Sequence, residues 1–212
     1  MQSNSAIKQQ FYSTIRDFQE SENYKKSRMQ EEVLRLLFCT PSWSANTDLK
    51  KIYAKVSVLN DFYSTNIYDT FGVSEAILGI KDFDQKLHNG NLNVVTELSK
   101  KWFQNKKRNI LSFASKYCAN HEPDLFPIYD SFVSAELWKQ HKKDNFIDDK
   151  TITSQSAFFK KVSEDYVFFA KTIKTFQQHY DLSDCSIRDI DFFLWCKGKK
   201  HKESDKRLSN KA

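Results

Sequence analysis

Glycine and proline are scarce in this chain, whose 212 residues include four Gly and three Pro. A many-stranded sandwich or barrel needs such residues at its turns, and a glycine-rich phosphate-binding loop needs several glycines close together. The chain is long enough to bury a hydrophobic core without disulfides or metal ions, and 40% of its residues are hydrophobic. The sequence therefore favours an all-α globular protein over a sheet-rich or mainly disordered one.

Apolar residues recur at helical spacing along almost the whole chain, and the alternation typical of strands is hard to find. About nine helices are expected, over residues 11–18, 33–37, 48–63, 74–87, 92–102, 110–121, 130–138, 158–180 and 187–194. The helices over 92–102 and 110–121 are separated by a short polar break, which predicts a tight helical hairpin. We expect a compact array of two packed helical halves, with residues 1–196 as a single domain.

Positive charge gathers at the C-terminal end of the chain. Residues 197–212 contain seven Lys or Arg and two acidic residues, whereas the net charge of the whole chain is +6. The rest of the chain is therefore nearly neutral. We expect residues 197–212 to form a disordered tail, which either contacts a polyanion loosely or has no partner.

A second basic cluster lies around Trp102 and Phe103. It consists of Lys100, Lys101, Lys106, Lys107 and Arg108, which fall within nine residues. Such a cluster can contact a phosphate backbone, although most runs of charge are only solvated surfaces.

Other sequence signals are negative. The four cysteines are far apart, and the five histidines lack the spacing of metal ligands, so we expect no metal and no cofactor. The chain has no long apolar run, and its N-terminus is polar. We expect a monomeric, cytosolic-type protein that does not bind membranes.

Asp130 begins a predicted helix in the segment FPIYDSFV, after a loop with Pro123 and Pro127. The simplest role for this side chain is an N-cap that accepts a hydrogen bond from the backbone N–H of Phe132 or Val133. The preceding order of a helix, a short turn, a basic second helix and a loop suggests a catalytic role as well.

That order resembles the helix-hairpin-helix superfamily of DNA glycosylases, the all-helical group that includes endonuclease III and the 8-oxoguanine glycosylases. The resemblance covers roughly residues 52–133. The family carries a motif of the form V-D-x-H-V with a catalytic Asp, and the segment Tyr129–Val133 matches it at the Asp and the closing Val. The segment NILSFASKYCANHEPDLFPIYDSFV also resembles a divergent bacterial branch of 8-oxoguanine-glycosylase-like proteins.

The resemblance implies an enzyme that flips a damaged or modified base out of double-stranded DNA and hydrolyses its N-glycosidic bond. Asp130 would stabilise the oxocarbenium-like sugar and orient or deprotonate the attacking water. If the enzyme also cuts the strand, Lys107 or Lys116 would be its nucleophile. The alternatives are a phosphate contact for Lys107 and a helix-surface amine for Lys116.

Five residues are candidates for binding the flipped base, because Asn reads base edges and aromatic rings stack on bases. They are Asn60, Tyr63, Asn66, Tyr129 and Phe132. An ordinary helix end is the alternative for the first three, and a place in the core is the alternative for the last two.

The chain departs from the family at the hairpin and in the motif. Gln104, Asn105 and Lys106 stand where the family has a glycine-containing turn, so the side chains of Lys106–Arg108 would replace backbone amides as phosphate contacts. Phe132 replaces the histidine of the motif.

Three further functions remain open at this point. The same scaffold would serve a phage-defence glycosylase that acts on modified bases in foreign DNA. A helical nucleic-acid-binding protein without turnover, or a structural protein that binds other proteins, would also fit the composition.

Overall fold

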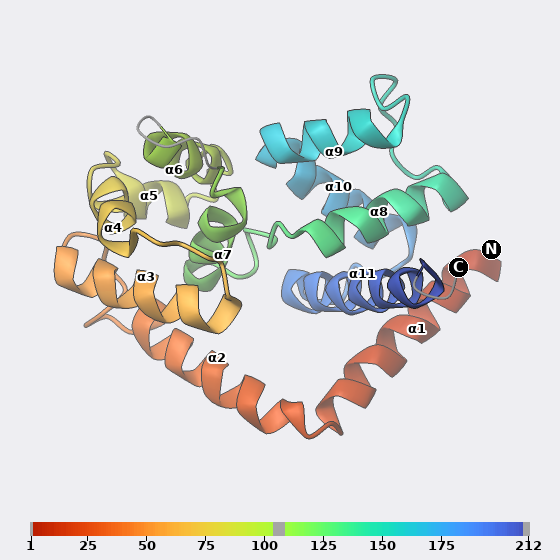
Figure 1. Cartoon of the computed structure of the whole chain (residues 1–212), viewed down its shortest axis with the longest axis horizontal. Helices are drawn as coiled ribbons and strands as arrows, with labels where there is room; N and C mark the ends of the chain where they lie inside the picture. The colour runs from red at the N-terminus through yellow and green to blue at the C-terminus, as the bar shows by residue number, and fades with distance from the viewer. Residues whose placement is uncertain (1, 104–108, 210–212) are drawn as a thin grey trace. The chain divides into compact units, whose positions relative to one another are not determined.

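The computed structural model describes residues 2–103 and 109–209 of the chain, and these form eleven helices and no strand (Figure 1). The helices are α1 (Gln2–Gln19), α2 (Asn23–Cys39), α3 (Leu49–Tyr63), α4 (Thr70–Leu78), α5 (Phe83–His88), α6 (Asn93–Phe103), α7 (Leu111–His121), α8 (Ser131–Asp144), α9 (Gln155–Glu164), α10 (Tyr166–His179) and α11 (Ile187–Ser209). The prediction of an all-α fold is confirmed.

The chain divides into two compact units. Unit 1 consists of Met1–Ser21 and Tyr129–Ala212, and unit 2 consists of Glu22–Ile128. The N-terminal helix α1 therefore belongs with the C-terminal helices, because Phe11 and Phe18 of α1 pack against Phe193 and Phe192 of α11. Two units agree with the two helical halves expected from the sequence.

Unit 2 contains α2 to α7, whose apolar faces meet in one core. Helix α7 is buried along nearly its whole length, from Leu111 to Ala119. The aromatic rings of Phe38, Phe83 and Phe113 surround Tyr117 of this helix. Helix α7 is thus the central helix of the unit, which explains why its sequence is apolar on more than one face.

The predicted helix over residues 74–87 is wrong, because two helices cover this range. Asp69 caps the first of them by accepting a hydrogen bond from the N–H of Gly72. Ser74 lies inside α4, where its hydroxyl donates to the carbonyl of Thr70. Helix α4 ends at Gly79, and α5 begins after Asp82, which adopts a left-handed backbone conformation.

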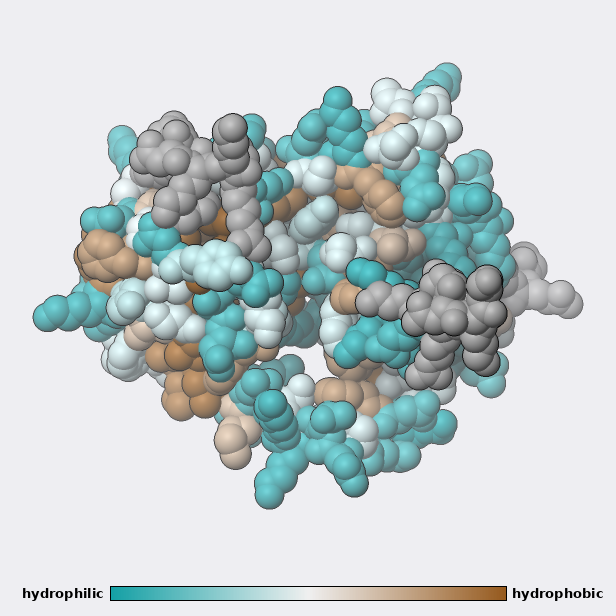
Figure 2. Space-filling view, viewed as in Figure 1, coloured by the Kyte–Doolittle hydropathy of each residue, from teal (hydrophilic) through white to brown (hydrophobic). Residues whose placement is uncertain are grey.

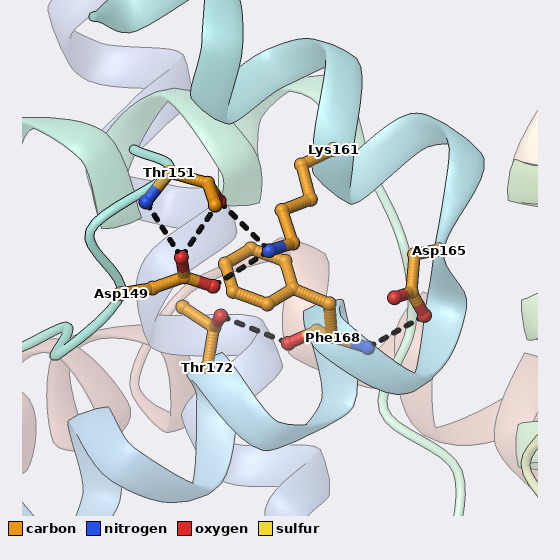
Figure 3. Close-up of polar contacts among 6 residues, drawn as sticks. All are labelled: Asp149, Thr151, Lys161, Asp165, Phe168 and Thr172. Atoms are coloured by element: carbon orange, nitrogen blue, oxygen red, sulfur yellow. Dashed lines mark hydrogen bonds and ion pairs between the residues drawn. The ribbon is translucent and has the colours of Figure 1, made fainter. Parts of the chain in front are cut away.

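The predicted helix over residues 158–180 is also two helices, which join at Asp165 (Figure 3). The carboxylate of Asp165 accepts a hydrogen bond from the N–H of Phe168 at 2.9 Å and so caps α10. Nearby, Lys161 of α9 donates to Asp149 at 2.6 Å and lies over the ring of Phe168. The bonds from Lys161 and Thr151 lower the pKa of Asp149 to about 2.

The predicted disordered tail over residues 197–212 is wrong for Lys197–Ser209, which continue α11. Contacts with α8 explain this helix. Gly198 lies so close to α8 that an added Cβ would come within 2.2 Å of the carbonyl oxygen of Phe132. His201 donates a hydrogen bond to the buried carboxylate of Glu136. Charge and composition alone predicted disorder because they carry no information about these tertiary contacts.

The surface seen in Figure 2 carries its hydrophobic residues in several separate patches among hydrophilic ones. Across the part of the chain that the structure describes, no helix combines the length and the apolarity needed to cross a bilayer.

Candidate functional site

Asp130 is the N-cap of α8 in unit 1, as predicted. Its backbone is extended, and its Oδ1 accepts a hydrogen bond from the N–H of Phe132 at 2.8 Å. Its own carbonyl accepts hydrogen bonds from the N–H and the hydroxyl of Ser134. The half-buried Asp130 therefore stands at the positive end of a helix of 14 residues.

Two of the predicted base-binding residues, Tyr129 and Phe132, stand on either side of Asp130 in the chain, and base binding stays a prediction for both. Tyr129 is half-buried, and its ring meets the ring of Phe169 edge-on at 5.2 Å between centroids. Burial raises the pKa of Tyr129; the charge of Asp130 acts in the same direction, and the hydroxyl of Ser134 acts against it. Tyr129 therefore keeps its phenolic proton at neutral pH.

Phe132 is also half-buried and connects the start of α8 to α11. Its ring meets that of Trp195 edge-on, and the ammonium of Lys202 lies 5.1 Å from its centroid. The start of α8 is thus lined with aromatic rings and has a cation within a few ångströms of one of them.

Lys116 lies in unit 2, on the buried helix α7, with 6% of its surface exposed. Its Nζ donates to the hydroxyl of Ser112 at 2.6 Å and lies 5.6 Å from the centroid of the Tyr63 ring. The alternative that Lys116 is a surface amine is therefore wrong. Two predicted site residues, Lys116 and Tyr63, are brought together here, and the ring face attracts the ammonium.

The other candidates for base binding in unit 2 have different surroundings. Asn60 holds the loop after α3, since its Oδ1 accepts hydrogen bonds from Thr65 and from the N–H of Ile67, while its Nδ2 donates to the carbonyl of Ile67. Asn66 is exposed and adopts a left-handed backbone with φ of 56°. A role in base binding stays a prediction for both residues, and Asn60 already has a structural one.

The predicted backbone contacts fall largely in the hairpin connection. Lys100 is exposed on α6, and α6 and α7 pack against each other, as expected for a hairpin. Helix α6 is described to Phe103, and α7 begins at Leu111. Lys101 belongs to α6, but its side chain is not described. Gln104, Asn105, Lys106, Lys107 and Arg108 lie outside the described residues.

Sequence reasoning missed a buried polar network in unit 2. The ammonium of Lys55 is completely buried and donates to the carbonyls of Ser44 and Ala45 and to Oδ1 of Asn46. The hydroxyl of Tyr117 donates to the same Asn46 oxygen at 2.6 Å. Burial lowers the pKa of Lys55 to about 8, although the charge of Asp84 acts in the opposite direction.

The network continues to His121. Burial, followed by the charge of Lys55, lowers the pKa of His121 well below its usual value, so its ring is neutral. Its Nε2 lies 3.2 Å from Nδ2 of Asn46 and accepts from it, because an amide nitrogen can only donate. Helical spacing contained the signal for this network, because Lys55 is three residues after the predicted core residue Ile52 and four before Leu59.

A second buried polar cluster lies in unit 1. Glu136 is 1% exposed, and its carboxylate accepts hydrogen bonds from His201 at 2.8 Å and from Gln140 at 2.6 Å. Lys139 donates to Nε2 of His201 at 2.9 Å, so Nδ1 is the nitrogen that faces the Glu136 carboxylate. This cluster joins α8 to α11. Among residues 2–103 and 109–209, no three His, Cys, Asp or Glu side chains are placed to hold a metal ion.

Comparison with known proteins gives the family of the chain. The model of the HI_0787_N family, described as an N-terminal domain, matches residues 9–125, which is more than half of the chain. The chain belongs to this family. A relative from Haemophilus influenzae, named an uncharacterized protein, is 34% identical over 154 residues, which cover 73% of this chain and 69% of the relative. No solved structure matches the chain.

The region matched by the HI_0787_N family includes the whole buried network of Lys55 and the burial site of Lys116. It ends just before Asp130. The predicted catalytic residues therefore differ in this respect, since Lys107 and Lys116 lie within the family match and Asp130 lies beyond it.

Proposed function

We propose that this protein is a DNA glycosylase of the cytoplasm, which flips a damaged or modified base out of duplex DNA and hydrolyses its N-glycosidic bond. The observation that carries the proposal is the placement of the Asp130 carboxylate at the start of α8, where it accepts the N–H of Phe132. The resemblance of the segment around it to helix-hairpin-helix glycosylases adds to this argument. The same chemistry would serve repair of damaged DNA or phage defence against modified bases in foreign DNA.

The chemistry that we propose for Asp130 follows from the charge of the transition state. As the bond between C1′ and the base nitrogen breaks, its electron pair leaves with the base and the sugar becomes cationic. The fixed negative charge of Asp130 stabilises that cation. A water oxygen then bonds to C1′, and Asp130 accepts the proton that the water loses.

Lys116 is our preferred nucleophile for a second, strand-cutting activity. A nucleophilic amine needs a desolvated setting, and Lys116 has one against Ser112 and Tyr63. The uncharged amine would bond to C1′ as the base leaves with the electron pair of the broken bond. The C1′–O4′ bond would then break with its electron pair going to O4′, which takes the amine proton, and a Schiff base forms between the amine and C1′. Removal of a proton from C2′ would then expel the 3′ phosphate and cut the strand. Lys107 remains the alternative nucleophile.

The direct experiment uses duplexes that each carry one damaged or modified base. Release of the base is detected by alkaline cleavage at the abasic site. We expect the wild-type protein to release at least one of these bases and Asp130→Asn to be strongly impaired. The control is Asp124→Asn, which removes an exposed carboxylate from the preceding loop and should retain activity. Absence of release from every duplex, or equal release by both variants, would overturn the proposal.

Borohydride trapping tests the lysine. A strand-cutting enzyme gives a covalent adduct with DNA when the Schiff base is reduced. We expect Lys116→Gln to abolish the adduct and Lys107→Gln to retain it. The reverse result would assign the nucleophile to Lys107. If the wild type gives no adduct, the protein has no strand-cutting activity and hydrolysis is its only proposed reaction.

The second candidate function is nucleic-acid binding without turnover. It is favoured by the lysines of α8 and α11, which are described below. DNA binding by a wild-type protein that releases no base would support it.

A further inference from the structure

Helices α8 and α11 approach each other closely in unit 1. Gly198 permits this contact because any larger residue would meet the backbone of Phe132. Both helices carry several lysines near this contact, and the charges of Lys139, Lys143 and Lys200 act on Lys197. We name the α8–α11 basic surface by its seven residues, which are Lys139, Lys142, Lys143, Lys197, Lys199, Lys200 and Lys202.

The lysines at the centre of this surface are near enough to influence one another. Lys197 is half-buried, and burial lowers its pKa. The positive charges of Lys139, Lys143 and Lys200 lower this pKa further, while the negative charge of Glu136 raises it. Crowding of like charges is unfavourable unless an anion neutralises it, so the surface is suited to a polyanionic partner.

The carboxylates in the same stretches of chain offset only part of this charge, since Glu203 is exposed and Glu136 lies 3.9 Å from Lys197. Residues 136–144 and 197–204 contain seven Lys against Glu136, Asp144 and Glu203. Glu136 is buried and bound by His201 and Gln140, and Asp144 accepts the hydroxyl of Tyr180. By contrast, residues 2–21, 129–135 and 145–196 of unit 1 contain eight Lys or Arg and eleven Asp or Glu, so they are net negative. Positive charge in this unit is therefore concentrated on α8 and α11.

Two of the lysines are held next to the start of α8. The ammonium of Lys199 lies 4.8 Å from the Trp195 ring, and that of Lys202 lies 5.1 Å from the Phe132 ring. Phe132 is two residues from Asp130 and donates its N–H to that carboxylate. The basic surface therefore extends to the helix end that bears the proposed catalytic group.

We propose that the α8–α11 basic surface binds the phosphate backbone of duplex DNA beside Asp130. This inference rests on the proposed function, which requires that the substrate strand be held while one nucleotide is flipped out. Phosphates are bound by lysine ammonium groups with release of counterions, and the surface presents these groups on two packed helices rather than on a flexible chain. Among described residues, α8 and α11 have no large exposed hydrophobic side chain, so the surface lacks the groups that insert into a membrane.

The test measures binding of undamaged duplex DNA by fluorescence anisotropy over a series of salt concentrations. The variant carries Lys139→Gln, Lys143→Gln and Lys200→Gln. The matched control carries Lys150→Gln, Lys171→Gln and Lys174→Gln, which remove three exposed lysines from other parts of the same unit. Circular dichroism and thermal unfolding establish that both triple variants fold.

We expect the surface variant to bind DNA about 10-fold or more weakly than the wild type. The slope of log K against log salt is negative, and its magnitude should decrease by about 2 to 3, as for the loss of two or three phosphate contacts. The control should match the wild type. Equal slopes for the two triple variants would overturn the inference, and so would a surface variant that loses binding to anionic phosphatidylserine vesicles while keeping its DNA affinity. Base release is a separate readout, so failure of the glycosylase proposal is distinguishable from failure of this one.

Discussion

The two units bury charges of opposite sign and satisfy them in different ways. In unit 2 the buried ammonium of Lys55 donates to uncharged oxygens, namely two backbone carbonyls and the amide of Asn46. In unit 1 the buried carboxylate of Glu136 accepts from His201 and Gln140, and the ammonium of Lys197 lies 3.9 Å away. The oppositely charged Asp84 acts on Lys55 only through space, since its carboxylate accepts hydrogen bonds from Asn46 instead.

This difference shows what each cluster does for the molecule. The Lys55 network fixes the loop after α2 against α3 and α7. Burial of the charged ammonium is unfavourable, and this lowers the pKa of Lys55. The Glu136 cluster fixes α11 against α8 and so positions the lysines of the α8–α11 basic surface. Loss of either cluster should affect its own unit, which the following predictions test.

The largest expected effect comes from Asn46→Ala in unit 2. This change removes the acceptor shared by the Lys55 ammonium and the Tyr117 hydroxyl, and leaves both buried. We expect the free energy of unfolding to fall by about 3–5 kcal/mol, as when one partner of a buried charge is removed. Urea unfolding measures this. Thr47→Ala, at the exposed neighbour, is the control, and a loss no greater than that of the control would contradict the network.

The second prediction concerns pH. Since the pKa of Lys55 is about 8 in the folded protein and 10.5 ordinarily, the unfolded chain binds more protons between these values. Stability therefore rises with pH in this window. We expect the contribution of Lys55 to increase by about 2–3 kcal/mol from pH 7 to pH 10. The measurement compares urea unfolding of wild type and Lys55→Met at both pH values, and parallel changes in the two proteins would refute the assignment.

The third prediction tests the contact between α8 and α11. Gly198→Ala places a Cβ against the carbonyl oxygen of Phe132, and this backbone atom cannot move as a side-chain tip would. We expect a loss of about 1–3 kcal/mol, as for other overpacked sites, even though alanine favours helices. Thermal unfolding provides the measurement. The control is Ser204→Ala, at an exposed site on the same helix, which should change the melting temperature little. A Gly198→Ala variant as stable as the wild type would show that α8 and α11 are farther apart than described.

The smallest effect is expected at the junction of α9 and α10. Asp165→Ala removes the cap on the N–H of Phe168 and should lower the free energy of unfolding by about 1 kcal/mol. Asp148→Ala removes an exposed carboxylate from the preceding connection and serves as the control. A single continuous helix over residues 158–180 would instead become more stable with alanine at position 165.

The sequence was most informative where local chemistry decides the structure. Scarcity of glycine and helical spacing predicted the all-α fold, and Asp130 was correctly predicted as an N-cap because that role needs only its own helix. The cap at Asp165 was missed because the apolar stripe of α9 continues in α10 at nearly the same spacing.

Features that depend on distant contacts were not predictable in this way. The helix over Lys197–Ser209 looks like a disordered tail until its contacts with Glu136 and Phe132 are known. Lys116 looks like a surface residue because its burial depends on helices that pack around α7. Lys55 is the intermediate case, since its position on the apolar face of α3 was visible but the oxygens that satisfy its charge come from the loop before that helix.

The most direct test of the central claim is the single-turnover rate of base release by wild type and Asp130→Asn, measured together with their melting temperatures. Asparagine also caps helices, so we expect melting temperatures within a few degrees of each other. The rate should fall on the order of 100-fold or more, because the charge that stabilises the sugar cation is gone. Equal rates at equal stability would show that Asp130 is only a helix cap and would contradict the account.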